Sequence, residues 1–269
     1  MFCRGIPGVD CVTTEGWVEY RPIHGFESPK LNRFPFSQPF MTQKVIFFDI
    51  DGTLLSTGGA GQKALELALV DGFGIDAPFE GVLTSGRTDR GIVDELLKRY
   101  QIQNTQEHRD QFRNAYLKRL PECLENAPGK LLPNVVDLVS KLAQQKHITL
   151  SVLTGNYVDA SWIKLRHYQL DQFFTFGGFG GQLAERDDVA RAALKAASDA
   201  MDFEVDGANT MVIGDTPADI RCARAIGAKA VGVATGSYNA QELATHKPDY
   251  VCDDFSATDS VAQTLLDLL

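Results

Sequence analysis

The sequence predicts an α/β protein built on a doubly wound parallel sheet, with an all-helical segment inserted after the first strand. Short apolar runs rich in Val, Ile and Phe alternate with stretches of helical period from about residue 44 onward. A segment of helical character separates the first apolar run from the second. Polar or acidic residues follow several of the runs directly, as is typical of the ligand-binding edge of an open α/β sheet.

The first apolar run, residues 45–48, leads into the sequence Asp49-Ile50-Asp51-Gly52. A run of this length and composition is typical of a buried strand. Buried strands rarely hold carboxylates, so we expect Asp49 and Asp51 at its carboxyl end. Gly52 allows an abrupt turn there, and both carboxylates can then approach one small substrate. A lone Asp-Gly pair is more often an ordinary turn, so this interpretation depends on the rest of the chain.

Residues 1–41 differ in character, because Gly and Pro interrupt them repeatedly and no apolar period persists. We expect an irregular N-terminal extension there, followed by the first part of the core at residues 42–56. The residues from Met41 to Lys44 resemble a natural protein start. The first 40 residues are therefore either a mis-assigned upstream start or a real extension, and the sequence leaves both open.

Residues 57–129 are expected to form a small helical cap, since they contain helical stretches and end where Pro and Gly break the pattern. These stretches cover approximately residues 64–69, 89–100 and 106–125. Within this segment Arg87 follows Gly86 in a loop, and a loop guanidinium is suited to holding a carboxylate or phosphate of a substrate. Thr88 and Asp89 are better explained as caps of the next helix.

Residues 130–269 are expected to complete the core. Further strands are predicted at residues 148–153, 173–176, 210–213, 230–233 and 250–252. Helices are predicted near residues 134–142, 156–168, 189–201 and 256–269. The glycines between residues 177 and 181 fit no nucleotide-binding spacing, so we interpret them as a turn.

Four places in the chain set polar residues at predicted strand ends or helix starts. They are Asp49 with Asp51, Thr154 with Gly155 and Asn156, Arg186, and Asp215 with Asp219. In a parallel sheet with right-handed crossovers these ends meet at one edge, which predicts a single site.

The residue types at these ends indicate a phosphoryl pocket with a divalent cation. Several carboxylates packed together repel one another unless a cation is present, and oxygen-only ligands favour Mg²⁺. The Thr154 hydroxyl and the backbone N–H groups that follow it form a ready anion site. Arg186 is poorly placed for the helix dipole, so another interaction is expected to hold it there. A purely structural divalent site is the alternative.

The composition indicates which kinds of molecule the protein is expected to bind and in which compartment it is expected. The net charge of −9 and the pI of about 5.0 disfavour nucleic acid and anionic membranes, which bind basic surfaces. Five cysteines without CxxC spacing favour a reducing compartment. The sequence has neither a run of roughly 18 apolar residues nor the apolar core of a signal peptide, so we expect a cytoplasmic protein. The oligomeric state stays open.

The run DIDGTLL resembles the first motif of the haloacid dehalogenase-like hydrolases, and the resemblance extends in order from Lys44 to the C-terminus. The run GDTPADI and the loop from Thr84 to Asp89 are similar to the branch that holds phosphoglycolate phosphatase and β-phosphoglucomutase. This resemblance implies a Rossmann-like core, a mobile helical cap that closes over the substrate, and Mg²⁺ as the cofactor.

The resemblance also implies roles for individual residues. Asp49 would be the nucleophile that attacks phosphorus, and Asp51 the general acid and base. The metal ligands would be the Asp49 carboxylate, the Asp51 backbone carbonyl and Asp215, with Asp219 in support; the phosphoryl group would bind to Thr154, Gly155 and Asn156. The family's third motif is usually a Lys, and this chain departs from it. Arg186 is the candidate replacement, and Lys195 is a weaker one because it lies well inside the predicted helix.

The function expected from this resemblance is a Mg²⁺-dependent phosphatase that hydrolyses a small phosphorylated metabolite, with phosphoglycolate as a candidate. A β-phosphoglucomutase-like phosphomutase is the alternative, since it uses the same aspartyl-phosphate. A phospho-accepting signalling module is a third hypothesis from another class. The helical insertion disfavours it, and so does Asp51, which would hasten hydrolysis of an aspartyl-phosphate that a signalling protein has to preserve.

Overall fold

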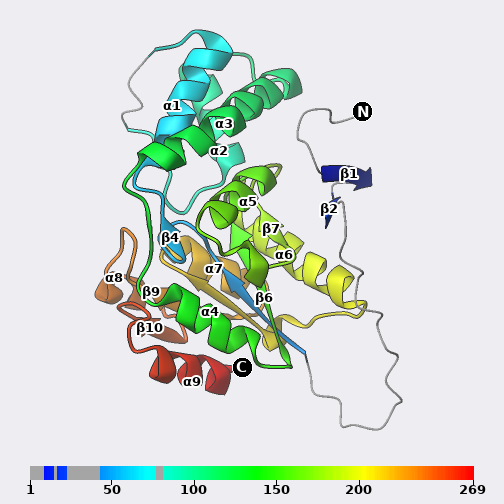
Figure 1. The fold of residues 1–269 in the computed structure, drawn as a ribbon, viewed down its shortest axis with the longest axis vertical. Helices are drawn as coiled ribbons and strands as arrows, with labels where there is room; N and C mark the ends of the chain where they lie inside the picture. Colours follow the sequence, from blue (N-terminus) through cyan, green and yellow to red (C-terminus); the bar gives the residue numbers. More distant parts are fainter. Residues whose placement is uncertain (1–8, 15–16, 23–42, 77–80) are drawn as a thin grey trace. The chain divides into compact units, whose positions relative to one another are not determined.

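The computed structural model describes residues 9–14, 17–22, 43–76 and 81–269, and its main feature is a sheet of six parallel strands (Figure 1). The strands are β3 (Lys44–Phe48), β6 (Ile148–Thr154), β7 (Gly177–Phe179), β8 (Thr210–Gly214), β9 (Lys229–Val233) and β10 (Tyr250–Cys252). Their order across the sheet is β10-β9-β8-β3-β6-β7. The first strand of the core therefore lies between β8 and β6, and the predicted doubly wound parallel sheet is confirmed.

Helices cover both faces of this sheet, and alternate residues of β3 point to opposite faces. Val45 and Phe47 join the apolar cluster under one group of helices, whereas Ile46 and Phe48 join the cluster under the other. The first group is α6 (Arg186–Met201), α7 (Pro217–Ala225) and α8 (Ala240–Ala244). The second contains α4 (Val135–Ala143), α5 (Val158–His167) and α9 (Thr258–Leu268). Burial on both faces explains why β3 is a continuous apolar run rather than an alternating one.

The edge strand β7 differs from the sequence prediction. The segment predicted as a strand begins in the 3₁₀ helix η1 (Asp171–Phe173), and the strand itself comes later, within the glycine run that was interpreted as a turn. A Cβ atom on Gly177 would lie 2.5 Å from Val152 Cγ2, and one on Gly178 would lie 2.6 Å from Ala193 Cβ. The glycines therefore let β7 pack closely against β6 and α6, a tertiary requirement that strand propensity does not reveal. A second 3₁₀ helix, η2 (Gly207–Asn209), precedes β8.

The described residues of the insertion that follows β3 form three helices. They are α1 (Ala60–Phe73), α2 (Asp89–Arg99) and α3 (Gln106–Asn126), in agreement with the predicted stretches. The chain enters and leaves the insertion through β4 (Leu55–Ser56) and β5 (Lys130–Leu131), which pair antiparallel. The apolar cluster between the helices continues into Tyr157 and Ala160 of the core. Met41–Leu269 is one compact unit, so the boundaries that separate a cap at 57–129 from the core stay a prediction.

The segment that begins α2 fixes the insertion to loops of the core. The Asp89 N–H donates to the Gly155 carbonyl at 2.6 Å, and the Tyr157 N–H donates to Asp89 Oδ2 at 2.6 Å. Thr88 caps α2 through the Gly91 N–H and donates its own hydroxyl to the Ala184 carbonyl at 2.8 Å. The predicted capping role of Thr88 is confirmed, and the same residue also joins the insertion to the sheet edge.

Met1–Phe40 forms a separate compact unit. In its described part β1 (Val9–Thr14) pairs antiparallel with β2 (Trp17–Pro22), so these two segments are not irregular as predicted. Their β-branched and aromatic residues favour extended structure, which explains the difference. The other residues of the predicted extension 1–41 lie outside the described residues.

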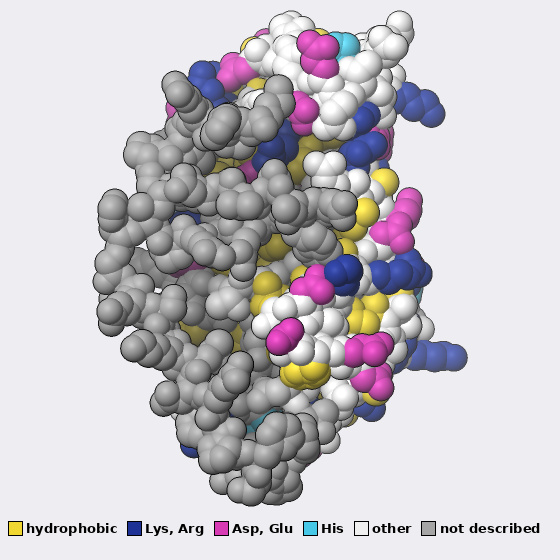
Figure 2. All heavy atoms as spheres, turned by 90° about the vertical axis from the view of Figure 1, so that its right-hand side faces the viewer, with side chains coloured by type: hydrophobic (Ala, Val, Ile, Leu, Met, Phe, Trp, Pro, Cys, Tyr) yellow, Lys and Arg dark blue, Asp and Glu magenta, His cyan; other side chains and the backbone are white. Residues whose placement is uncertain are grey.

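Acidic and basic side chains are interspersed on the described part of the face in Figure 2. Within the ranges that the structure describes, no helix has the length and apolar character needed to cross a membrane.

Deletion of residues 1–40 is expected to leave the melting temperature unchanged, because Met41–Leu269 contains the whole six-stranded sheet and forms its own compact unit. Thermal unfolding of the full and truncated chains measures this. A deletion that extends to residue 48 removes β3 and serves as the destabilised control. Loss of soluble protein on removing only residues 1–40 would contradict the expectation.

The free energy of unfolding of Asp89→Asn is expected to rise, relative to that of the unsubstituted chain, as the pH rises from about 4 to about 6. Burial raises the pKa of Asp89 from 3.8 to about 6, against the opposing effects of Lys164 and the Tyr157 N–H. The folded state then binds the proton more tightly than the unfolded state, so stability is lost as pH rises through this window.

An Asn at position 89 can still accept the Tyr157 N–H but does not titrate. At about 1.4 kcal/mol per pKa unit, its relative gain should reach at most ~3 kcal/mol and then level off above pH 6. Denaturant unfolding at several pH values measures the difference, with the exposed Asp137→Asn as control. A difference that does not change with pH would show that Asp89 is not buried in solution as described.

Candidate active site

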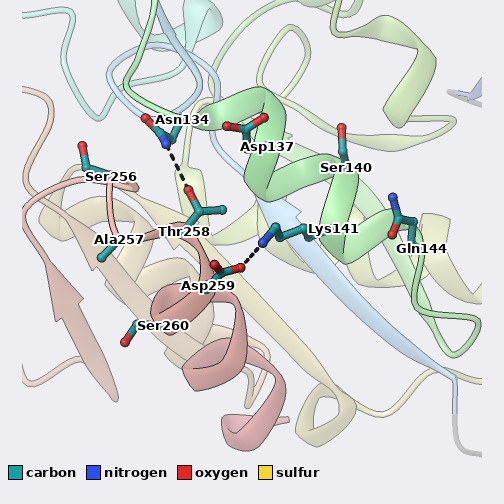
Figure 3. A pocket seen from close by; sticks show the side chains of 10 residues that line it. All are labelled: Asn134, Asp137, Ser140, Lys141, Gln144, Ser256, Ala257, Thr258, Asp259 and Ser260. Carbon is teal, nitrogen blue, oxygen red and sulfur yellow. Dashed lines mark hydrogen bonds and ion pairs between the residues drawn. The ribbon is translucent and has the colours of Figure 1, made fainter.

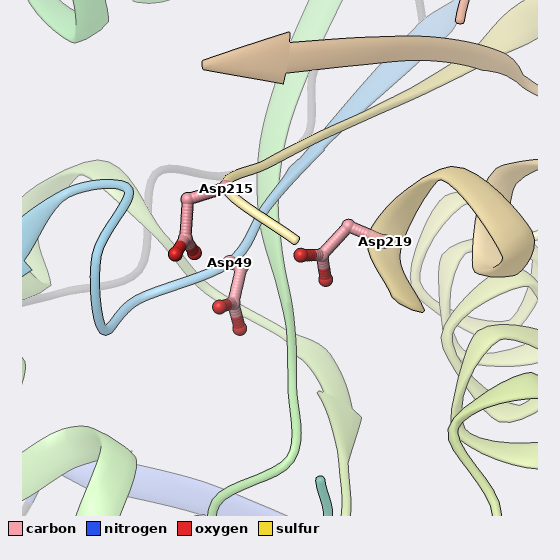
Figure 4. A group of neighbouring side chains, drawn as sticks. All are labelled: Asp49, Asp215 and Asp219. Carbon is pink, nitrogen blue, oxygen red and sulfur yellow. The ribbon is translucent and has the colours of Figure 1, made fainter. Parts of the chain in front are cut away.

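Three buried carboxylates meet at the carboxyl edge of the sheet. Asp49 follows β3, Asp215 follows the neighbouring strand β8, and Asp219 lies in the first turn of α7. One oxygen from each lies within 4.8 Å of the others. Figure 4 shows the three side chains directed toward a common space. The pairing of β3 with β8 produces this approach, as the convergence of strand ends predicts.

The turn after β3 is shaped by contacts with Asp215. Gly52 has a φ of 88°, which favours glycine, and a Cβ atom there would lie 2.5 Å from Asp215 Oδ2. The Thr53 hydroxyl donates to Asp215 Oδ1 at 3.3 Å, and the Thr235 hydroxyl donates to the Gly52 carbonyl at 2.6 Å. The Asp-Gly-Thr sequence therefore lets the chain turn beside the Asp215 carboxylate without a steric clash.

Arg186 lies against the same carboxylates from the first turn of α6. Its side chain is only 4% exposed, its Nη1 lies 3.6 Å from Asp49 Oδ1, and its Nη2 donates to Asp219. Burial opposes the charged form, but Asp219 and Asp49 outweigh that effect and raise the pKa of Arg186. These ion pairs explain a cation at an unfavourable helix end. Lys195, the weaker candidate, is exposed and pairs with Asp199 on its own helix.

Asp219 is occupied by contacts within the protein. Its Oδ2 accepts the Thr216 N–H at 3.1 Å, as part of a capping box at the start of α7, and it also accepts the Thr216 hydroxyl at 2.7 Å. Its Oδ1 accepts from Arg186. Since both oxygens have donors, this geometry suits a supporting role for Asp219 better than direct ligation.

Asp49, Asp215 and Asp219 form an acidic group, and the single positive charge of Arg186 does not offset their combined negative charge. Burial, then the charge of Asp219, raises the pKa of Asp49 to about 7. Burial, Asp219 and Asp49 likewise raise the pKa of Asp215 to about 8. Full ionisation near neutral pH thus needs further positive charge, and a donor set of carboxylate oxygens fits Mg²⁺. Asp49 and Asp215 are the side chains available to hold it.

Asp51 belongs to a different set of contacts, although it lies only two residues from Asp49. Its Oδ2 accepts from Lys164 Nζ at 2.6 Å and from Asn156 Nδ2 at 2.8 Å. Its carboxylate is not part of the acidic group, so only its backbone carbonyl is left as the predicted ligand.

The predicted phosphoryl-binding residues lie at the end of β6, next to β3. The Thr154 hydroxyl accepts from Asn156 Nδ2 at 2.7 Å, and both side chains are buried. The Gly155 carbonyl is held by the Asp89 N–H, and the Asn156 carbonyl by the Gly180 N–H at 2.9 Å. This loop is therefore held from two sides by backbone hydrogen bonds.

Arg87 is not among the side chains gathered at the sheet edge. Its guanidinium pairs with Glu95 and donates to the carbonyls of Leu83 and Gly91, all within its own segment. Substrate contact by Arg87 stays a prediction, and it requires the guanidinium to leave Glu95.

Lys164 and Thr53 were not identified from the sequence, although both contact carboxylates of the site. A signal for Lys164 was present, since it falls on the same helical face as Ala160, Ser161 and Leu165, all of which are buried. A lysine on the apolar face of a helix needs a partner. Thr53 carries no such signal, because a hydroxyl in a turn is ordinary.

A surface pocket of about 710 Å³ lies elsewhere, between α4 and the start of α9 (Figure 3). Two pairs of its lining residues contact each other, as Asn134 donates to Thr258 and Lys141 pairs with Asp259. None of the strand-end residues lines it, so it has no part in the site.

Comparisons with known proteins agree with this geometry. The "Probable phosphatase IndB" of Dickeya dadantii is 26% identical over 83% of the chain and 95% of that protein, and a "Phosphoglycolate phosphatase" of Aliivibrio fischeri is 24% identical over 79% and 93%. Among solved structures, CbbY from Rhodobacter sphaeroides in complex with phosphate has a TM-score of 0.63 at 20% identity, covering 80% of this chain and 96% of that one.

A predicted phosphoglycolate phosphatase from Haemophilus somnus has a TM-score of 0.59 at 23% identity, covering 84% of this chain and all of that one. The similarity to these two solved structures shows the fold alone. The family model "haloacid dehalogenase-like hydrolase" matches residues 43–227, from β3 through the acidic group to the end of α7. The chain belongs to the haloacid dehalogenase-like hydrolases.

Proposed function

We propose that this hydrolase is a Mg²⁺-dependent phosphatase of small phosphate monoesters that works through an aspartyl-phosphate on Asp49. The observation that carries the proposal is the contrast between two carboxylates of one turn. Asp49 is buried beside Arg186 and two further carboxylates, whereas Asp51 is about one-third exposed and accepts from Lys164 and Asn156. Two carboxyl groups in such different surroundings suit two different roles.

The contacts of Asp49 support its role as the nucleophile. It lies where β3 ends, and Arg186 Nη1 is 3.6 Å from its Oδ1. Its oxygen would bond to phosphorus as the ester P–O bond breaks, and Asp51 would give a proton to the departing oxygen. In the second step Asp51 would take a proton from water as the water oxygen bonds to phosphorus and the bond to Asp49 breaks.

The neighbouring groups support the binding of a phosphoryl group. The Thr154 hydroxyl and the Gly155–Asn156 backbone offer donors beside Asp49, and Arg186 supplies positive charge at the same place. Mg²⁺ held by Asp49, the Asp51 carbonyl and Asp215 would neutralise charge on the phosphoryl oxygens when bound. Asp219 would keep Arg186 and the start of α7 in place.

The substrate class we propose is a small phosphorylated metabolite of the cytoplasm. Phosphoglycolate is the first candidate, because relatives of this chain in Aliivibrio fischeri and Haemophilus somnus carry that substrate in their names.

A panel of small phosphomonoesters, assayed with Mg²⁺ and with a chelator, tests the proposal. Release of inorganic phosphate that stops with chelator is the expected result. Interconversion of sugar phosphates without net phosphate release would favour the phosphomutase instead. A long-lived phosphoprotein without turnover would favour the signalling hypothesis.

Asp49→Asn and Asp51→Asn are expected to fail differently. The amide of Asp49→Asn cannot attack phosphorus, so turnover should be abolished. Asp51→Asn keeps the nucleophile but loses proton transfer, which usually costs roughly 10²–10⁴ in rate. With Mg²⁺ and an aryl phosphate, whose leaving group needs no proton, Asp51→Asn should accumulate an adduct one phosphoryl group heavier by intact mass. The adduct should map to Asp49. Near-normal activity of Asp49→Asn, or an adduct on another residue, would contradict the nucleophile assignment.

Arg186→Met is expected to lower kcat by about 10²–10³, the usual effect of losing a donor that stabilises developing charge. Lys195→Met should change kcat little, because Lys195 is exposed and pairs within α6. Steady-state kinetics of both variants, with melting temperatures as the folding control, measures the ranking. A larger loss in Lys195→Met would show that Arg186 is not the third-motif cation.

A further inference from the structure

We infer that Lys164 is a positioning residue, whose ammonium group holds the Asp51 carboxylate in the orientation from which Asp51 transfers protons. The inference rests on the proposed function, in which Asp51 is the general acid and base. It concerns a residue of α5, beyond the strand-end motifs from which that function is argued.

The burial of Lys164 is the first observation. Its side chain is 4% exposed and lies on the packed face of α5 with Ala160 and Leu165. An ammonium group at such a position loses hydration that only close partners can offset, whereas a methionine would fill the space without that cost. Nζ donates to Asp51 Oδ2 at 2.6 Å and to Asn156 Oδ1 at 2.7 Å. The charge is therefore held by the site and has no role in the packing of the helix.

The second observation is which oxygen of Asp51 is held. Lys164 and Asn156 both donate to Oδ2, and Oδ1 accepts from no other group in the described part of the chain. An oxygen with two strong donors is a poor carrier for a proton, so transfer uses Oδ1. The Asp51 side chain is 37% exposed, so the carboxylate is anchored on one side and accessible to a substrate.

The third observation is that the same contacts reach the phosphoryl-binding loop. Asn156 Nδ2 donates both to Asp51 Oδ2 and to Thr154 Oγ1, at 2.8 and 2.7 Å. Lys164 holds the other end of that amide through Oδ1, which fixes its orientation. The position of Asp51 is thereby tied to the loop proposed to bind the phosphoryl oxygens. Holding a reacting group in this way accelerates a reaction, because a small displacement of the group lowers the rate strongly.

Lys164 is not a proton carrier in either step. In the first step the proton on Asp51 Oδ1 goes to the ester oxygen as its bond to phosphorus breaks and the Asp49 bond forms. In the second step Oδ1 takes a proton from the attacking water as the Asp49 bond breaks. Lys164 keeps its protons throughout and acts through Asp51.

Lys164→Met tests the inference, with Arg166→Met as the matched control because Arg166 is on the same helix and exposed. For an alkyl monoester, Lys164→Met should lower kcat by about 10–10²-fold, below the roughly 10²–10⁴ expected from losing Asp51 itself, with little change in KM. Adduct formation from an aryl phosphate should be nearly unchanged, and hydrolysis of the adduct, followed by intact mass, should slow by a similar factor. Equal losses for the two leaving groups, or activity equal to that of Arg166→Met, would overturn the inference.

A double-mutant cycle with Asp51→Asn separates positioning from a general structural role. If Lys164 acts through Asp51, adding Lys164→Met to Asp51→Asn should slow adduct hydrolysis by less than about threefold. The same factor in both backgrounds would overturn the inference and leave the proposed function intact. Absence of any adduct on Asp49 in Asp51→Asn would overturn the proposed function instead. If Lys164→Met does not fold, Lys164→Gln, whose amide keeps N–H donors but carries no charge, replaces it in the same cycle.

Discussion

The repulsion among three buried carboxylates at one sheet edge is the constraint on which the rest of the site depends. Asp49, Asp215 and Asp219 approach within 4.8 Å because β3 and β8 are neighbours and α7 begins beside them. Such a group is unstable unless cations offset it. Arg186 supplies one such charge from the first turn of α6, where a helix by itself would favour an acid. The remaining negative charge makes the same place suited to Mg²⁺.

The two carboxylates in the turn after β3 lie in different surroundings because of the order of the strands in the sheet. Asp49 points toward β8 and its acids, whereas Asp51 contacts residues that follow β6. Because β3 lies between these two strands, its terminal turn contacts both sides at once. A central strand in a doubly wound sheet is thus the position from which two closely spaced acids can acquire separate roles.

Much of this arrangement could be predicted from the sequence, because apolar runs ending in acids mark strand ends. That pattern predicted Asp49 and Asp215 at one sheet edge, and the unfavourable place of Arg186 at a helix start predicted a partner for it there. The glycine strand β7 was missed because its requirement for small residues comes from close packing against β6 and α6. Lys164 was missed because a lysine in a helix is usually exposed. Only the spacing of the small and apolar residues around it on α5 places it on the buried face. For β7 the deciding information is tertiary, whereas for Lys164 it lies in the helical spacing of the neighbouring residues.

Helix α5 and the loop before it connect the parts of the site that the sequence presents separately. The loop carries the residues proposed to bind phosphate, and Tyr157 at its end packs in the apolar cluster of the insertion. Asp159 pairs with Arg113 of α3, and Lys164, further along the same helix, reaches Asp51. A movement of the insertion relative to the sheet would therefore change contacts of the same helix that holds Asp51, the proposed general acid. If the insertion closes over a substrate as the family resemblance implies, α5 is the element that would link that closure to the position of Asp51.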